Sequence, residues 1–322
     1  MSTPSRKHSL FLEWRLCMND AGRKHVLVAG GSGLVGTRLC QELQRAGYEV
    51  SILSRREGTS PEGIPFVLWS SLNQVIPSAY AVINLAGEGI ADKRWSPKRK
   101  NAILSSRTDT TTRLVEAYRE AGDRRPRILV NASAIGIYGP HDGRPIDEKS
   151  SIGEGFLADV CRDWEAAADP VTQLGVRLSK VRIGIVLSRK GGALPKMSLP
   201  VRFFQGAKLG DGQQGFSWIH IDDLVSILIH CVENDQYQGV LNATSPFPTT
   251  NETFTRLLGK QLRRPILPVP AFVTRFALNL LMGEMAEAML LKGAFVYPKA
   301  LQGLGFKFKF ERPEGALKDL LG

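Results

Sequence analysis

The sequence predicts an α/β fold: a Rossmann-type, doubly wound parallel sheet with a smaller, mostly helical C-terminal cap domain on the substrate side. Three observations predict it. From His25 onward, short apolar runs alternate with stretches of helical spacing, a glycine-rich turn follows the first run, and the rhythm changes after Val186. Because the strand-like runs are apolar throughout, helices are expected on both faces of the sheet.

The elements are expected in a regular order along the chain. Residues 25–29 form a β-branched first strand, and residues 34–46 form a helix that Gly47 ends. Further strands are expected at residues 49–54, 65–69, 81–86, 127–132, 180–187 and 239–242. Further helices are expected at residues 96–121, 156–174 and 221–232.

This order divides the chain into a leader, a sheet domain and a cap. Residues 1–23 precede the first strand, and their apolar run is too short and too charged for a signal-peptide core, so a tail is predicted. Residues 24–245 are assigned to the sheet domain, to which loop 187–218 adds part of the substrate side. Residues 246–322 form the cap, which seven prolines punctuate. A ligand is expected between cap and sheet, outside the carboxyl ends of the strands.

The composition is that of an ordinary globular protein. With 43% hydrophobic and 23% charged residues among 322, it excludes wholesale disorder and fibrous repeats. The most apolar stretches, residues 224–232 and 276–282, fall short of the roughly 18 residues that span a bilayer, so both are predicted to be buried helices and no membrane partner is expected.

The cysteines indicate a reducing compartment. They are far apart, form no CxxC pair and are therefore expected to be free thiols, with neither a disulfide framework nor a zinc site. We expect a cytoplasmic protein with no bound metal. The four cysteines are Cys17, Cys40, Cys161 and Cys231.

The charge balance is unusual. Forty-two Lys and Arg face 31 Asp and Glu, for a net charge of +11. Such an excess can mark a nucleic-acid partner, but the basic pairs are dispersed and no segment interleaves them with regular aromatics. Most of these residues are therefore expected to lie on solvated faces, and no nucleic-acid partner is predicted.

The glycine-rich turn is the strongest local motif. Gly30, Gly33 and Gly36 have GxxGxxG spacing, directly after a strand and at the start of a helix. This pattern gives a tight turn, lets backbone N–H groups approach a pyrophosphate, and lets the helix pack closely on the strand. Dinucleotide binding is favoured over a purely structural turn. The residues expected at the cofactor are Gly30, Ser32, Gly33, Leu34, Val35 and Gly36.

The end of the second strand favours NADP(H) over NAD(H). NAD sites usually place an acid there for the ribose 2′-hydroxyl, whereas this strand ends in Ser54, Arg55 and Arg56. These side chains can form charge-assisted hydrogen bonds with a 2′-phosphate. The alternative is a surface turn with two solvated arginines. Residues 24–245 are accordingly predicted to be an NADP-binding Rossmann domain.

Several motifs resemble those of the extended short-chain dehydrogenases/reductases. A more specific set resembles an atypical subfamily known as the epimerase family, or NAD-dependent epimerase/dehydratase family (cell division inhibitor-like), and the likeness covers residues 24–322. The general motifs are Asn84-Leu85-Ala86-Gly87, residues 133–139 and residues 218–223, and the specific ones are Gly87-Glu88, Lys93-Arg94-Trp95, Ser106-Arg107 and Gly303-Leu304-Gly305-Phe306.

The resemblance implies a Rossmann fold, a family-specific C-terminal domain and NADP(H). It places Ser54 and Arg55 at the 2′-phosphate, and residues 85–87 (Leu85, Ala86 and Gly87) on the adenosine and ribose side. It also places Arg107 on the long helix at the cofactor, the alternative being an exposed arginine. Val186, at the end of a strand over residues 182–186, is placed near the nicotinamide. Family members commonly associate through the long helices, so a homodimer is one alternative.

The chain departs from the family's catalytic pattern. Reductases and epimerases of this kind use Tyr-x-x-x-Lys, in which the lysine lowers the tyrosine pKa for proton transfer. No tyrosine occurs in residues 150–169, and aligning Glu165 with the acid that often follows the lysine puts Leu157 and Cys161 at the two positions. Cys161 is expected to be a small buried hydrophobe rather than a nucleophile.

Two other residues are candidates for catalysis. Ser133 is a candidate hydrogen-bond donor to a substrate oxygen, in a stretch one residue longer than the usual spacing. Tyr138 can in principle supply a proton, the alternative being a packing role.

Several polar residues leave alternatives open. His220 is expected to orient its loop, with Asp222 or Asp223 capping a helix that starts at Leu224. Glu88 could contact substrate or fasten the cap through an arginine such as Arg94.

Two segments of the cap side also leave alternatives open. Loop 206–215 could admit a phosphate-bearing substrate or form a tight hairpin. Residues 271–282 could meet a partner or a membrane surface, although a place in the core is expected.

Two hypotheses follow. The first is an NADP(H)-dependent oxidoreductase or epimerase-like enzyme acting on an unidentified small molecule through a non-standard proton donor. The second is a catalytically weak NADP(H)-binding sensor or cell-division regulator, which the missing Tyr-x-x-x-Lys pair favours.

Overall fold

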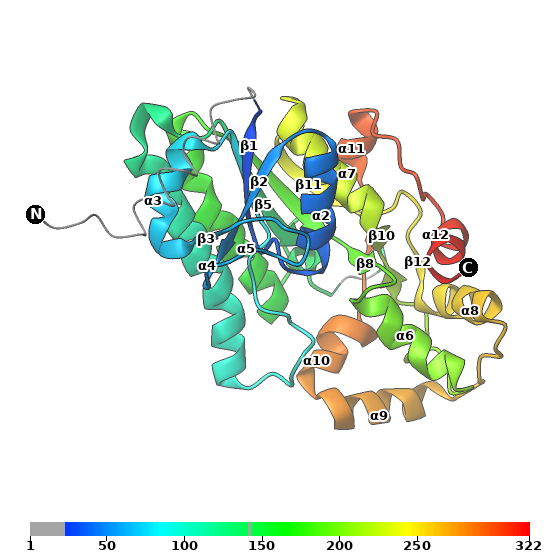
Figure 1. Ribbon diagram of the computed structural model, residues 1–322. Coiled ribbons are helices and arrows are strands. Elements are labelled where there is room, and N and C mark those ends of the chain that lie inside the picture. The colour runs from blue at the N-terminus through cyan, green and yellow to red at the C-terminus, as the bar shows by residue number, and fades with distance from the viewer. Residues whose placement is uncertain (1–22, 141–142) are drawn as a thin grey trace, which may run out of the picture.

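A computed structural model describes residues 23–140 and 143–322. Cys17 and the predicted leader, apart from residue 23, lie outside these ranges. The centre of the molecule is a seven-stranded parallel sheet with the strand order β11-β7-β5-β4-β1-β2-β3 (Figure 1). The strands are β1 (His25–Ala29), β2 (Glu49–Ser54), β3 (Phe66–Leu68), β4 (Ala81–Asn84), β5 (Ile128–Ala134), β7 (Arg177–Ile183) and β11 (Gly239–Ala243). The predicted Rossmann-type sheet is confirmed.

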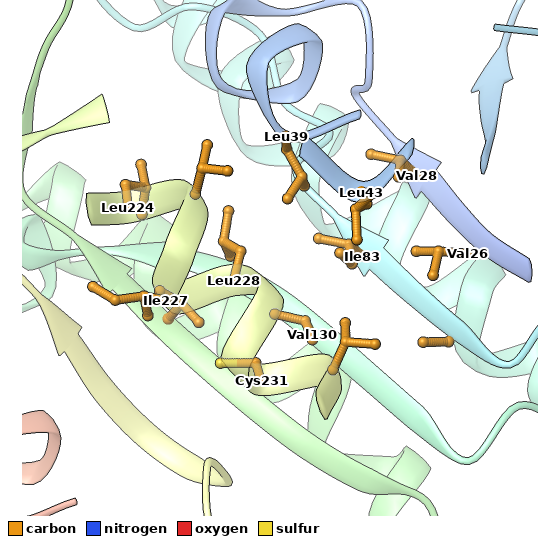
Figure 2. Close-up of a cluster of buried hydrophobic side chains, with 14 of the residues drawn as sticks. Val26, Val28, Leu39, Leu43, Ile83, Val130, Leu224, Ile227, Leu228 and Cys231 are labelled. Atoms are coloured by element: carbon orange, nitrogen blue, oxygen red, sulfur yellow. The ribbon is translucent and has the colours of Figure 1, made fainter. Parts of the chain in front are cut away.

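Helices cover both faces of the sheet, as the apolar strands predict. On one face, α2 (Leu34–Arg45) lies over β1 and α7 (Ile221–Glu233) lies over β5 and β7, and their side chains, such as Leu39 and Leu228, share one hydrophobic cluster with Val28 and Val130 (Figure 2). The other face is covered by α3 (Leu72–Val75), α4 (Pro97–Glu120) and α5 (Phe156–Ala168). Successive residues of β1 therefore belong to two different hydrophobic clusters.

Short helices and small sheets complete the sheet domain. The helical turns span Trp69–Ser71, Ile76–Ser78, Gly122–Arg124, Ile135–Tyr138 and Asp169–Leu174, and α6 spans Ala193–Arg202. Three two-stranded sheets pair β8 (Ile185–Leu187) with β10 (Trp218–His220), β9 (Gly215–Phe216) with β12 (Thr249–Thr250), and β6 (Pro145–Ile146) with β13 (Phe295–Val296).

The C-terminal region is mostly helical, as predicted. It contains α8 (Asn251–Leu262), α9 (Ala271–Met282), α10 (Glu284–Ala286), a π-turn at Glu287–Leu291, α11 (Lys299–Gly303) and α12 (Pro313–Leu321). Leu301 and Phe306 pack into the same cluster as α2 and α7, so part of this region completes the core of the sheet domain. The boundary at residues 245 and 246 stays a prediction.

Two predicted elements differ from those observed. The strand expected at residues 180–187 is divided at Gly184, where a Cβ atom would lie 2.9 Å from Ser217 O, and β8 continues in a separate sheet with β10. The helix expected at residues 156–174 leaves α-geometry after Ala168, because Pro170 has no N–H for the next helical bond.

The structure also overturns the prediction of a buried helix at residues 276–282. None of the residues of α9 is buried, and Phe276 is 71% exposed. The helix at residues 224–232, by contrast, lies in the core as part of α7.

Candidate functional site

The candidate cofactor site lies at the carboxyl edge of the central sheet. The chain leaves β1 in one direction to build β2 and β3, and returns on the other side of β1 to build β4 and β5. Ligands of doubly wound sheets bind at this reversal, where the loops diverge and leave a crevice. The turn after β1 and the loop after β4 flank it.

The glycine turn brings three backbone segments into close contact. Gly30 has a φ of +76°, which favours glycine, and a Cβ atom there would lie 2.6 Å from Leu85 O. A Cβ atom on Gly36 would lie 2.3 Å from Gly30 O. Any side chain at either position would therefore push α2 or the loop after β4 away from the turn.

The start of α2 has the properties of an anion site. Gly33 is its N-cap residue, no side chain caps the first turn, and that turn carries no acidic residue. Ser32 and Gly33 are exposed, so the first N–H groups of the helix can reach a phosphate. The backbone space left by the glycines fits a pyrophosphate.

The end of β2 presents two unpaired cations. The Ser54 hydroxyl accepts a hydrogen bond from Arg56 N at 3.1 Å, which fixes the turn. Arg55 and Arg56 are exposed, and neither forms an ion pair with an acid within residues 23–140 and 143–322. These three residues fit a 2′-phosphate better than a neutral ribose, and their contact with a cofactor stays a prediction.

A buried amide network holds the loop after β4. Asn84, fully buried at the end of the strand, donates to Asn131 Oδ1 at 2.7 Å and to Thr111 Oγ1 at 2.9 Å. Its own Oδ1 accepts from Ala86 N at 3.2 Å, which sets the path of residues 85–87. From the sequence, Asn84 is identified only as part of the motif over residues 84–87, and its hydrogen-bonding role is not predicted. A polar residue ending an apolar strand is the pattern that could have identified this role.

Arg107 lies under the same loop. Its guanidinium donates to Ile103 O at 2.8 Å and to Glu88 O at 3.0 Å, and lies 5.1 Å from the centre of the Trp164 ring. Burial lowers the pKa of Arg107. The side chain is half-buried rather than exposed, and a Cβ atom on Gly87 would lie 3.0 Å from its Cζ. Arg107 thus supports the loop expected to carry the cofactor.

Val186 is not at the end of a strand over residues 182–186. It lies in β8, beyond the break at Gly184, and pairs with Ile219 of β10. It is half-buried and packs against the same cluster as Leu34 and Val35. The loop after β8 reaches the glycine turn, since a Cβ atom on Gly192 would lie 3.1 Å from Leu34.

Ser133 forms a hydrogen bond with one member of a buried ion pair. Its hydroxyl donates to Glu165 Oε1 at 2.7 Å. The Arg182 guanidinium binds both oxygens of Glu165, at 2.8 and 2.9 Å. All three side chains are buried, so the carboxylate is stable there only because it is paired.

Tyr138 belongs to the same network. Its hydroxyl donates to Asn242 Oδ1 at 2.8 Å and accepts from Arg182 Nη1 at 3.0 Å. Burial raises the pKa of Tyr138, and the positive charge of Arg182 opposes this effect. Sequence reasoning missed Arg182, which is one of three basic residues on β7 and therefore does not stand out in the sequence.

The positions of the absent Tyr-x-x-x-Lys pair face the end of β5. A Cβ atom on Gly136 would lie 3.3 Å from Leu157 Cβ and 4.0 Å from Cys161 Sγ. Burial raises the pKa of Cys161 to about 11, so the thiol stays protonated at neutral pH. Cys40, Cys161 and Cys231 are free, as predicted, and all three are buried, as predicted for Cys161.

The capping prediction at Asp222 and Asp223 is wrong. Helix α7 begins at Ile221, and His220 caps it by accepting from Asp222 N at 3.1 Å through Nδ1. Asp222 pairs with Arg38 at 2.9 Å. Asp223 accepts from the backbone N–H groups of Lys309 and Phe310. A histidine replaces the usual cap because its ring also stacks on Phe310, with 3.9 Å between ring centres.

Helix α4 carries two ion pairs near the C-terminal region. Glu88 pairs with Arg99 rather than with Arg94, and Lys100 contacts Glu284 of α10 at 2.6 Å. A Cβ atom on Gly283 would lie 3.0 Å from Arg94 Nη2. The Trp95 ring packs edge-on against Phe156 at 4.8 Å.

Two cavities border these residues. One of about 350 Å³ lies beside the glycine turn, between Ser32, Gly33 and the loop at Ser188, Arg189 and Lys190. The other, of about 560 Å³, is lined by Tyr138 and by residues 151 and 153–155. In the part of the chain that the structure describes, no group of three or more His, Cys, Asp or Glu side chains could hold a metal ion, and no helix is long and apolar enough to cross a membrane.

Comparison with known families and proteins gives a consistent assignment. Residues 26–155 match the family described as NAD dependent epimerase/dehydratase, and residues 273–320 match a domain of unknown function, DUF1731. The chain is 38% identical over 306 residues to an Arabidopsis thaliana protein, "Epimerase family protein SDR39U1 homolog, chloroplastic", covering 92% of this chain and 86% of that protein. It is 35% identical over 303 residues to an epimerase family protein of Staphylococcus aureus, covering 92% and 99%.

Solved structures extend the likeness to three dimensions. Human epimerase family protein SDR39U1 (isoform 2), crystallised with NADPH, has a TM-score of 0.83 at 35% identity, covering 92% of this chain and 99% of that one. A nucleoside-diphosphate sugar epimerase from Corynebacterium glutamicum has a TM-score of 0.76 at 32% identity, covering 98% and 62%.

Proposed function

The chain belongs to the NAD-dependent epimerase/dehydratase family, and on that premise we propose that it binds NADP(H) and acts as an oxidoreductase or epimerase-like protein on a small molecule. The observation that carries the proposal is the pairing of a glycine turn open to a pyrophosphate with a β2 end that presents Ser54, Arg55 and Arg56. The relative crystallised with NADPH supports the choice of cofactor.

Each part of the site has a binding role in this proposal. The first N–H groups of α2, next to Ser32 and Gly33, hold the pyrophosphate, and Leu34, Val35 and Gly36 position that helix turn. Arg55 and Arg56, with Ser54, neutralise the 2′-phosphate. Residues 85–87, held by Asn84 and Arg107, form the wall on the adenosine and ribose side, and Val186 lies toward the nicotinamide. When bound, the nicotinamide supplies hydride transfer.

Tyr138 and Ser133 are proposed for the reacting end. A cation beside a phenol stabilises the phenolate, and Arg182 lies 3.0 Å from the Tyr138 hydroxyl. Arg182 thereby opposes the rise in the Tyr138 pKa that burial causes, and so acts in the same direction as the lysine of the usual pair. Glu165 holds Arg182 in place and accepts the Ser133 hydrogen bond. Tyr138 is also one of the residues that line the larger cavity, although its side chain is buried.

The cofactor proposal is tested by replacing Arg55 with Asp. Titration calorimetry with NADPH and NADH should show about tenfold or greater loss of NADPH affinity, because a charge-assisted bond becomes a repulsion, and little change for NADH. The matched control is Arg124→Asp, because Arg124 is also an exposed arginine but lies in the helical turn Gly122–Arg124. An equal loss for both cofactors would contradict the assignment of Arg55 to the 2′-phosphate.

A second candidate function is a catalytically weak NADP(H)-binding sensor or cell-division regulator. Leu157 and the protonated Cys161 at the positions of the usual pair favour it, because neither can transfer a proton at neutral pH. A broad substrate panel with NADPH distinguishes the two candidates through the nicotinamide absorbance. Turnover that Tyr138→Phe abolishes supports the enzyme, and tight NADPH binding without any turnover supports the sensor.

The proposal also includes the location of the protein and its partners. We place it in the cytoplasm with an unidentified small-molecule substrate. A homodimer through the long helices and a division into residues 24–245 and 246–322 stay predictions.

A further inference from the structure

Helix α9 presents an apolar face to solvent. Thr274, Leu278 and Met282, spaced four residues apart, are its only half-buried residues, so the helix meets the protein along one narrow row. The opposite face carries large apolar side chains that are mostly exposed, with Phe272 at 74% and Phe276 at 71%. That face consists of Phe272, Val273, Phe276, Ala277, Leu280 and Leu281.

The C-terminal end of α6 adds to this surface. Leu199, Phe203 and Phe204 are exposed, and α6 and α9 lie on the same side of the molecule (Figure 1). The loops between them are joined by backbone hydrogen bonds, since Leu267 N donates to Gly206 O at 2.7 Å. Gly210 N also donates to Thr274 Oγ1 at 3.0 Å, so the two helices are tied to each other.

The same two segments carry much of the excess positive charge. Residues 193–210 and 260–283 hold seven Lys and Arg and no Asp or Glu, against a net charge of +11 for the whole chain. The seven are Lys196, Arg202, Lys208, Lys260, Arg263, Arg264 and Arg275.

Four of these charges are available to a partner. Lys196, Lys208 and Arg275 form ion pairs with acids of neighbouring segments. Arg202, Lys260, Arg263 and Arg264 are exposed and form no ion pair with an acid among the described residues. The Arg264 guanidinium instead lies 4.6 Å from the centre of the Phe204 ring, so a basic side chain contacts an exposed apolar one there.

We propose that α9 and the end of α6 form a docking surface for an anionic lipid bilayer. Aromatic and leucine side chains on one helix face, rimmed by basic residues, match the interface between acyl chains and negative headgroups. The helix lies on the membrane and does not cross it. This surface, rather than dispersed solvated faces, accounts for a large share of the positive charge.

The charge also selects a bilayer over a second copy of the chain. A symmetric dimer through this surface would bring the unpaired Arg202, Arg263 and Arg264 of the two copies close together, and like charges at close range disfavour such a contact. A nucleic acid would match the charge but would leave Phe276 and Leu280 without an apolar partner.

Vesicle flotation tests the proposal directly. The full chain should bind phosphatidylcholine vesicles that contain phosphatidylglycerol, and bind pure phosphatidylcholine vesicles at least tenfold more weakly. Phe276→Glu should weaken binding about tenfold or more, because the side chain no longer enters the apolar layer. Arg202→Gln should weaken it roughly fivefold, as expected for loss of one basic contact at an anionic surface.

Matched variants control for non-specific effects. Ile152→Glu replaces an exposed apolar residue elsewhere, and Arg124→Gln removes an exposed charge elsewhere, so both should bind vesicles like the wild type. Circular dichroism and NADPH titration confirm that each variant is folded.

Several outcomes would overturn the proposal. These are absence of binding by the wild type, equal binding to both vesicle types, or normal binding by Phe276→Glu. A dimer in light scattering that Phe276→Glu converts to a monomer would assign the surface to a second copy. Because vesicle binding is measured without cofactor, its failure leaves the proposed function untouched.

Discussion

His25 is a buried histidine of the seven-stranded sheet. It stands at the start of β1, and its Nε2 lies 3.0 Å from Ser51 Oγ on the neighbouring strand β2. Burial lowers the pKa of His25 from 6.5 to about 4, since a charged ring would have to be desolvated. The folded chain therefore keeps this imidazole neutral at pH values where the unfolded chain protonates it.

This difference predicts a loss of stability in acid. The contribution of His25 is complete above pH 6.5 and decreases as the pH falls toward 4, by about 3 kcal/mol in all. Urea unfolding at pH 7 and pH 4.5 measures it, with His25→Asn as the variant that cannot titrate. A variant whose free energy of unfolding falls as steeply as that of the wild type would show that other groups cause the loss.

At this scale, sequence reasoning succeeded where one residue type serves one local purpose. The glycines of the turn and the basic end of β2 are identified by their neighbours in the chain. The pair of Glu165 and Arg182 is different, because its members lie on α5 and β7 and meet only after both pack on the sheet. In the sequence, Glu165 served only to align this region with the Tyr-x-x-x-Lys pattern. None of its neighbours in the chain indicates that Arg182 is its partner.

At the scale of elements, Asp223 joins α7 to the C-terminal segment. Its two carboxylate oxygens accept from Lys309 N at 2.7 Å and from Phe310 N at 3.0 Å. The side chain is buried, so both backbone N–H groups would lose their partner without it. The segment leading into α12 is thus held by a residue almost 90 positions earlier.

Asp223→Ala should loosen that segment selectively. We expect a destabilisation of about 1–3 kcal/mol from two unsatisfied N–H groups and faster hydrogen exchange over residues 307–322. Mass spectrometry resolves the exchange by segment, and Asp235→Asn at a 96% exposed side chain serves as control. Unchanged exchange in Asp223→Ala would show that packing alone holds α12.

Two of the misjudged elements depend on contacts with residues distant in the sequence. The apolar residues 276–282 predicted a buried helix, but composition does not show whether another element covers that helix. Only one row of α9 side chains is half-buried, and the others are exposed. The start of α7 was misjudged because His220 is a rare capping residue, and it is fixed there by stacking on Phe310.

At the scale of the whole molecule, the cofactor proposal predicts a thermal shift. A ligand that binds only the folded chain stabilises it by about 2.7 kcal/mol at one hundred times its Kd. Differential scanning fluorimetry should show a larger rise in Tm with NADPH than with NADH at equal concentration. Arg55→Asp should reduce the NADPH shift to the NADH value, and equal shifts in the wild type would contradict the preference.

The overall architecture was predictable because it rests on repetition. The strands β1, β3, β4 and β5 are each followed by a helix or helical turn, and right-handed crossovers leave few ways to arrange such units in one sheet. The C-terminal region lacks this repetition, and its helices are placed by contacts between residues distant in the sequence, such as Leu258 with the cluster of Leu317, and Lys100 with Glu284. Its helical content could be predicted, but its contacts could not.

The strand order also has a kinetic consequence. The strands β3, β2, β1, β4 and β5 lie side by side in the sheet, and all of them end by Ala134. During synthesis these five strands leave the ribosome before β7 and β11. Each of them then already has at least one neighbouring strand with which it can pair. The glycine turn after β1 can therefore be assembled while the C-terminal helices are still being translated, and β7 and β11 extend an edge that already exists.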